Sequence, residues 1–331
     1  MEIKALDVKK LRDMTGAGMM DCKNALVQAE GNFERAQEII REKGKLVAAK
    51  RADRETTEGA VITRIEGNKG IIVCLGCETD FVSKNEEFQT LANTIADAAI
   101  KAFPADIEGL KAVTLPSGDT VETAVTLQTG KTGEKHTLAF YAAVEAPYIA
   151  AYMHKITGKL AAIVGFSKAL NEEDAKGIAI QVATMNPVAV DKDSVPQSVI
   201  DNELTVAIQK TKEELIGKAV DAALKKAGIN PAHVDSEDHI QSNTAKGWLT
   251  PEQADQARSI KETVAAEKAA NLNEDMIKNI ANGRLSKFFK EQTLVEQEYQ
   301  MGDGKQSVRE FLAGIDKEIK VVAFKRFSLA D

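Results

Sequence analysis

The feature that most constrains the fold is a change in hydrophobic periodicity near Gly59. Before residue 54, apolar side chains recur every three or four positions, a spacing typical of helices. From Val61 the period falls to two, and the turn residues 66–70 separate this segment from the β-branched run Ile71–Leu75. This pattern predicts a β-hairpin. A helical segment is therefore expected to precede a segment that contains sheet.

A strand, a short connection, a helix and a proline then occur twice. A Ser-x-x-Glu capping box predicts that the first helix begins near Ser83, and Pro104 ends it. The second helix, over 172–185, follows a strand over 158–166 and ends before Pro187. We expect further strands at 125–127 and 137–144, joined by a glycine-containing loop at 130–133. The repetition predicts an α+β fold with two related subdomains, each a small antiparallel sheet covered by helices.

The first 54 residues predict three short helices with a basic end. Thr15–Gly18 interrupts the first helical pattern, Gly31 stops the second, and Asn32 caps a third that Gly44 ends. The segment has a net charge of +3, and residues 45–54 are typical of a solvated helical linker.

A long helical arm is predicted inside the second subdomain. Apolar residues from Ile200 to Leu224 have the spacing of one amphipathic helix, a turn follows at 228–231, and Thr250 with Pro251 starts a second helix. The segments after the arm predict helices over 274–292 and 307–313 and a strand over 319–327. The predicted organisation is, in order, a helical domain with linker (1–54), a core N-subdomain (55–146), the first part of a core C-subdomain (147–208), the inserted arm (209–271) and the second part of the core C-subdomain (272–331).

Composition restricts the class of protein. The 331 residues carry a net charge of −7 and are 44% hydrophobic, which is ordinary for a globular protein with a core. The chain lacks the basic character that attracts nucleic acid, and no long apolar run predicts a membrane span. Three cysteines without a regular framework fit a reducing compartment. We expect a cytoplasmic protein that binds neither nucleic acid nor membranes.

The sequence predicts no catalytic residue, no metal site and no cofactor. Gly130–Thr132 resembles part of a phosphate loop, but Val125 occupies the position where that motif requires glycine. Cys74 and Cys77 are expected on opposite faces of a strand, which suits neither a metal nor a disulfide. His233, Asp235, Asp238 and His239 lie in a polar turn of the arm, where solvation is the simpler interpretation. We therefore expect a protein that is not an enzyme.

Two segments are unusual for a self-contained fold. Met19 and Met20 begin a helix, and adjacent helical positions diverge by about 100°, so at least one is expected at the surface. A partner-binding patch and a core position for the other Met are equally compatible with this spacing. Asp80 and Phe81 fall in a short connection between a strand and a helix. Spacing alone slightly favours Phe81 folding back as a hydrophobic staple over a projecting pair.

Several motifs resemble one known family. Leu11–Lys23 (LRDMTGAGMMDCK) resembles the N-terminal signature of the bacterial elongation factor Ts family, and Cys77–Val82 (CETDFV) resembles its second signature. Tyr152–His154 and Ile178–Ala183 (IAIQVA) are similar to two later landmarks, in the same order. The resemblance implies a ubiquitin-associated-like (UBA-like) N-terminal domain of three helices, then two similar subdomains bearing an inserted coiled coil.

The resemblance also implies a function and its residues. Members of the family are guanine-nucleotide exchange factors for elongation factor Tu, the GTPase that carries aminoacyl-tRNA. Thr79, Asp80, Phe81 and Val82 would contact that GTPase beside its Mg²⁺ and phosphate site and promote release of GDP. The N-terminal contacts that it implies are Arg12, Met19, Met20 and Lys23. Gln181, where some members carry His, would make a weaker contact with a second GTPase domain.

Other interpretations stay open at this point. The N-terminal helices alone are also compatible with a UBA-like protein-binding module or a chaperone-type scaffold, since exposed methionines adapt to many partners. The long arm is compatible with a homodimer. Both alternatives share the expectation that the chain acts by binding another protein.

Overall fold

The computed structural model describes residues 3–302 and 305–330 and has two compact units. The first contains the chain up to residue 190 together with the chain from residue 297, and the second contains residues 191–296. Helices and antiparallel sheets are combined in the first unit, whereas the described part of the second is helical. The predicted α+β class is confirmed.

The N-terminal helices are α1 (Ala5–Thr15), α2 (Met19–Gln28) and α3 (Phe33–Lys50), and their shared core includes Leu11, Leu26 and Ala36. Gly16 ends α1 with φ +67°, and the Asn32 side chain caps α3 as predicted. Unlike the prediction, α3 does not end at Gly44 but continues to Lys50. Gly44 instead lets a second helix approach closely, because a Cβ on Gly130 of that helix would lie 2.7 Å from the Gly44 Cα.

The first sheet has the order β1-β2-β3, with β1 (Glu58–Glu66), β2 (Lys69–Cys77) and β3 (His136–Glu145) all antiparallel. Both faces of β2 are buried, which explains its nearly continuous apolar sequence. Val73 and Leu75 belong to a core shared with helix α5, whereas Ile72 and Cys74 pack toward the second sheet.

Helices α4 (Asp80–Ser83), α5 (Glu86–Ala102), α6 (Ile107–Lys111) and α7 (Val121–Thr132) lie between β2 and β3 in the chain. Two predictions are corrected here. The long helix begins after Asn85, whose side chain accepts hydrogen bonds from two backbone N–H groups, and Ser83 instead ends the short α4. The expected strand 125–127 and loop 130–133 belong to α7, which Thr120 caps and Gly133 ends. Packing against α3 favours helix where the short run Val125-Thr126-Leu127 alone suggested strand.

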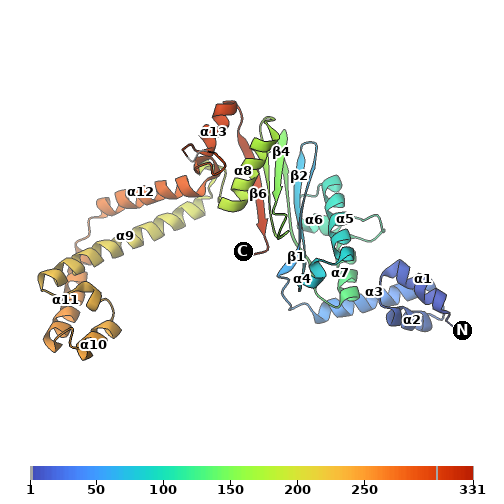
Figure 1. The fold of residues 1–331 in the computed structure, drawn as a ribbon, viewed down its shortest axis with the longest axis horizontal. Coiled ribbons are helices and arrows are strands. Elements are labelled where there is room, and N and C mark those ends of the chain that lie inside the picture. Colours follow the sequence, from blue (N-terminus) through green and yellow to red (C-terminus); the bar gives the residue numbers. More distant parts are fainter. Residues whose placement is uncertain (1–2, 303–304, 331) are drawn as a thin grey trace. The chain divides into compact units, whose positions relative to one another are not determined.

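The second sheet has the order β4-β5-β6, with β4 (Tyr148–Met153), β5 (Leu160–Phe166) and β6 (Val321–Ser328). Helix α8 (Glu172–Met185) packs against β4 and β5. The two sheets pack face to face (Figure 1). Phe140 of β3 stacks on Phe327 of β6 with ring centroids 4.3 Å apart. Strand β4 was not predicted.

The predicted repetition is present in detail. Helices α5 and α8 both follow the middle strand of their sheet and both begin after a capping asparagine, Asn85 and Asn171. Both end at a left-handed residue directly before a proline, with φ +46° at Phe103 and +45° at Asn186. The predicted helix near 307–313 is α13 (Val308–Ile315), which begins with a capping box at Ser307.

The second unit contains α9 (Gln197–Lys226), α10 (Glu237–Ala245), α11 (Pro251–Ala270) and α12 (Glu274–Gln292), with α9 and α12 side by side (Figure 1). Helix α12, predicted within the core C-subdomain, therefore belongs to the arm. Ion pairs Glu214–Arg284 (2.7 Å) and Lys212–Glu274 (3.3 Å) join it to α9. Short 3₁₀ helices are η1 (Lys192–Ser194), η2 (Pro231–His233) and η3 (Leu294–Glu296). In the described ranges 3–302 and 305–330, every helix is too short or too polar to cross a bilayer.

Candidate functional site: a projecting aromatic turn and an exposed methionine pair

The Thr79–Val82 segment forms the short turn that joins β2 to α5. Thr79 is extended and caps α4, because its Oγ1 accepts the Val82 N–H at 3.4 Å. Val82 packs against the core beneath α5, and the buried Ser83 hydroxyl donates to the Asp80 carbonyl at 3.0 Å. The turn is therefore anchored at both ends by burial and hydrogen bonding.

Phe81 points away from this anchored turn and is 83% exposed. The interpretation favoured by spacing alone, a staple folded back on the protein, is therefore wrong. Val82 supplies the apolar contact that a staple would have made, so the neighbouring position faces solvent. An aromatic ring left in water forgoes the free energy of hydrophobic burial, so a partner that covered the Phe81 ring would gain it.

Asp80 stands beside Phe81 and is ionised at neutral pH. Its Oδ2 lies 2.7 Å from the Lys84 Nζ, one helical turn away. The hydrogen bond from Lys84 lowers the pKa of the Asp80 carboxyl, and the backbone N–H groups of Asp80 and Phe81 act in the same direction. The turn thus presents a negative charge and an aromatic ring next to each other at the surface.

Glu134 holds the base of the turn, a role that nothing in the local sequence indicates. Its Oε1 accepts the Thr79 hydroxyl at 2.8 Å, and its Oε2 accepts the Thr79 N–H at 3.1 Å. The two residues are 55 positions apart, and α7 and the turn after it bring Glu134 to Thr79. Only the tertiary structure reveals this residue.

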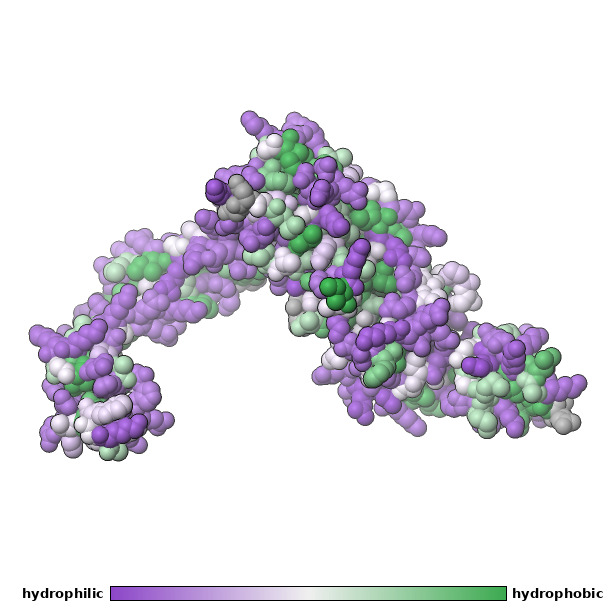
Figure 2. Space-filling view, in the orientation of Figure 1, coloured by the Kyte–Doolittle hydropathy of each residue, from purple (hydrophilic) through white to green (hydrophobic). Residues whose placement is uncertain are grey.

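Met19 and Met20 are both exposed, at 46% and 65%, in the first turn of α2. The prediction that at least one lies at the surface is confirmed, and the other does not belong to the core. Arg12 of α1 and Lys23 of α2 are also exposed. Apolar side chains gather on the surface of the N-terminal helices (Figure 2). The exposed large apolar residues of α1 and α2 are Leu6, Met14, Met19, Met20 and Val27.

Gln181 is fully buried in α8, so its side chain does not lie at a contact surface. Its Nε2 donates to Gln297 Oε1 and to the Glu298 carbonyl, both at 3.1 Å, and its Oε1 accepts the Gln300 N–H at 3.0 Å. The sequence expectation placed Gln181 in direct contact with a partner. The structure instead gives it the role of holding the segment 297–300 against α8.

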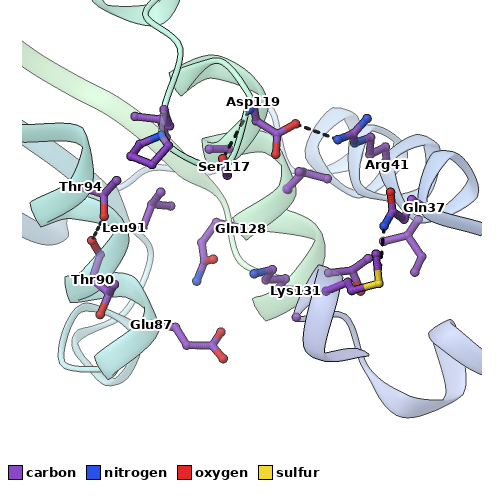
Figure 3. A pocket seen from close by; sticks show the side chains of 18 of the residues that line it. Gln37, Arg41, Glu87, Thr90, Leu91, Thr94, Ser117, Asp119, Gln128 and Lys131 are labelled. Atoms are coloured by element: carbon purple, nitrogen blue, oxygen red, sulfur yellow. Dashed lines mark hydrogen bonds and ion pairs between the residues drawn. The ribbon is translucent and has the colours of Figure 1, made fainter. Parts of the chain in front are cut away.

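A cleft of about 810 Å³ opens between the N-terminal helices and the N-subdomain (Figure 3). Gln128 and Lys131 of α7 line it opposite Gln37 of α3, and Arg41 of α3 reaches Asp119 at 2.9 Å along one edge. This ion pair joins the helical domain to the core. The lining mixes charged, amide and apolar groups and provides no pairing of a nucleophile with a base.

The cysteines lie as predicted, on opposite faces of β2. Cys74 packs toward the second sheet and Cys77 toward α5. Burial raises the pKa of both thiols to about 12, so both are protonated at neutral pH. In the arm, His239 contacts Asp235 as an exposed pair. Across the described residues no group of three or more His, Cys, Asp or Glu side chains has the geometry to hold a metal ion.

Comparison with known proteins agrees with this arrangement. The family model described as elongation factor TS matches residues 78–331. Elongation factor Ts of Bacteroides fragilis is 54% identical over 330 residues, and that of Phocaeicola vulgatus is 52% identical over 329 residues. Elongation factor Ts of Christiangramia forsetii is 39% identical over 332 residues. Each alignment covers 99% of both chains.

These likenesses place the chain among the translation elongation factors. It belongs to the elongation factor Ts family.

Proposed function

We propose that this chain is a guanine-nucleotide exchange factor that promotes GDP release from elongation factor Tu. The observation that carries the proposal is the anchored turn that exposes Phe81 beside an ionised Asp80, in a member of the elongation factor Ts family. The proposal requires no covalent chemistry, so the chain acts by binding alone.

The proposed mechanism is displacement of the partner's ion and phosphate contacts. A GTPase holds GDP through phosphate-loop N–H groups and a Mg²⁺ ion, whose strong, close charges make the site sensitive to small shifts. Phe81 would enter between side chains of the GTPase, and the Asp80 carboxylate would add negative charge near the Mg²⁺ ligands. The GTPase then holds GDP less tightly, and by linkage GDP weakens the binding of the exchange factor by the same factor.

The N-terminal helices would supply a second point of contact. Met19 and Met20 are soft, polarisable side chains that pack on varied apolar surfaces, and Arg12 and Lys23 would lie at the rim of the contact. Because Gln181 is buried, exposed residues of α8 such as Met185 would make any contact with a second GTPase domain.

The experiment that tests the proposal is stopped-flow release of a fluorescent GDP analogue from elongation factor Tu. We expect the release rate to rise with the concentration of this protein and then saturate. An unchanged release rate at saturating protein would contradict the proposal.

The alternative of a binding module without exchange activity draws on the exposed methionine pair. Under that alternative the protein would bind the GTPase, as measured by calorimetry, and leave GDP release unchanged. A homodimer through the arm is a separate proposal, which sedimentation equilibrium of the full chain tests directly.

A further inference from the structure

Charged groups hold Glu78 and Thr79, the two residues that precede Asp80. We call this cluster the acidic clasp; it consists of Glu78 and Glu134 with their partners Arg51, Lys135 and Thr79. Arg51, at the end of α3, donates from Nη1 to both carboxylate oxygens of Glu78 at 3.0 Å. The Lys135 N–H donates to Glu78 Oε1 at 2.6 Å.

The clasp connects three parts of the first unit. The Lys135 Nζ donates to the carbonyls of Ala52 and Arg54, at 2.6 and 2.7 Å, and so fixes the chain that leaves α3. Glu134 directly precedes Lys135 and holds Thr79 by its N–H and its hydroxyl. The end of α3, the start of β3 and the base of the Phe81 turn are therefore joined through consecutive residues.

The chemistry of the clasp favours a rigid arrangement. Burial by itself would raise the pKa of Glu78, but the hydrogen bonds from the Lys135 N–H and from Arg51 outweigh it and hold the pKa below its usual value. Hydrogen bonds to an ionised carboxylate are shorter and about twice as strong as neutral ones. A rigid turn loses little conformational entropy when its exposed ring enters a partner, so more of the ring's interaction energy remains to displace the nucleotide and raise the maximal release rate.

We propose that Glu134 and Glu78 are positioning residues, which act on exchange through Phe81 by holding the turn in the orientation that presents its ring. The proposal rests on the exchange function proposed above. Neither carboxylate needs to touch the GTPase. Glu134 and Glu78 lower the free-energy cost of ordering the turn that carries Phe81. Without the Phe81 ring, an ordered turn no longer helps exchange, so the effect of both carboxylates on exchange is lost.

The decisive experiment is a double-mutant cycle on GDP release. Glu134→Gln keeps the shape of the side chain but faces the Thr79 N–H with an amide that has only one acceptor oxygen. We expect it to lower the maximal release rate about tenfold, the effect of one charge-assisted hydrogen bond. Because Glu134 acts through Phe81, the same change in a Phe81→Ala background should lower the rate by less than about twofold. Glu122→Gln, on the exposed side of α7, is the matched control and should leave the rate unchanged.

A second comparison tests the link to α3. Arg51→Met removes both bonds to Glu78 and should lower the maximal rate in the same direction, whereas the neighbouring exposed Lys50→Met should not. The half-saturating concentration of the factor should change little in Glu134→Gln, since Met19 and Met20 are untouched. Thermal unfolding of each variant identifies any loss that comes from misfolding.

Hydrogen exchange of residues 79–83 in the free protein gives a readout that needs no GTPase. We expect faster exchange there in Glu134→Gln and not in Glu122→Gln. Unchanged exchange, a wild-type release rate, or a full additional loss in the Phe81→Ala background would each overturn the positioning proposal. A wild-type protein that fails to accelerate GDP release would instead overturn the exchange function, whatever the hydrogen-exchange result.

Discussion

Replacing Phe81 with alanine tests the contribution of the ring to partner binding separately from its contribution to the free energy of unfolding. The ring is 83% exposed, so its removal should change the free energy of unfolding by less than about 0.5 kcal/mol. An aromatic side chain has about 200 Å² of surface, so the exposed part corresponds to roughly 160 Å² available for burial in a partner. At about 25 cal/mol per Å², complete burial would contribute about 4 kcal/mol.

That figure is an upper value, because ordering the ring and imperfect packing reduce it, and truncation of aromatic residues at interfaces typically costs about 2–4 kcal/mol. We therefore expect Phe81→Ala to slow GDP release from elongation factor Tu by about 30- to 1,000-fold at subsaturating factor. The assay is stopped-flow release of fluorescent GDP, with Tm measured by circular dichroism on the same preparation.

The matched control is Ile156→Ala, which removes an even more exposed apolar side chain (92%) from the turn between β4 and β5. It should leave both Tm and the release rate at wild-type values. Exchange by Phe81→Ala at the wild-type rate would refute the reasoning, and so would an equal loss in the Ile156 control.

Three further predictions concern other parts of the molecule. Met19→Asp combined with Met20→Asp should raise the half-saturating concentration in the release assay about tenfold or more with little change in Tm, since both side chains are exposed; an unchanged value would exclude them from the contact. Burial lowers the pKa of His136, although the carbonyl of Glu134 and the charges of Glu134 and Glu78 act to raise it. As pH falls, the unfolded chain therefore binds the proton first, so the free energy of unfolding should decrease below about pH 6.5. Urea unfolding of His136→Asn should show a weaker pH dependence of this free energy than the wild-type protein. The same pH dependence in both proteins would contradict this prediction. Gln181→Leu removes three hydrogen bonds and should lower the free energy of unfolding by about 2–3 kcal/mol in urea, so a wild-type value would contradict its structural role.

The overall architecture follows closely from sequence because its signals are local and repeated. The prolines after Phe103 and Asn186 stop two equivalent helices. The alternating pattern from Val61 and the β-branched run Ile71–Leu75 predict a hairpin, and β1 and β2 form it. The errors occur where a local signal was short. The three residues at 125–127 suggested a strand, but packing on α3 makes them helical.

The site was less predictable because its determinants are distant in sequence. The exposure of Phe81 depends on Val82 entering the core and on Glu134 fixing Thr79 from 55 positions away. Gln181 is buried because residues 297–300, more than 100 positions later, return to cover it. Periodicity and capping patterns extend over a few residues, so neither contact leaves a mark in the local sequence.

The central claim is that Phe81 and Asp80 weaken the hold of another protein's Mg²⁺ and phosphate site on GDP. The most direct test compares GDP release from elongation factor Tu with and without the factor, first in Mg²⁺ and then in excess chelator. The mechanism predicts a larger acceleration in Mg²⁺ than in chelator, and a smaller gap between wild type and Phe81→Ala once the ion is removed. Equal acceleration under both conditions, with the same gap between the two proteins, would contradict it.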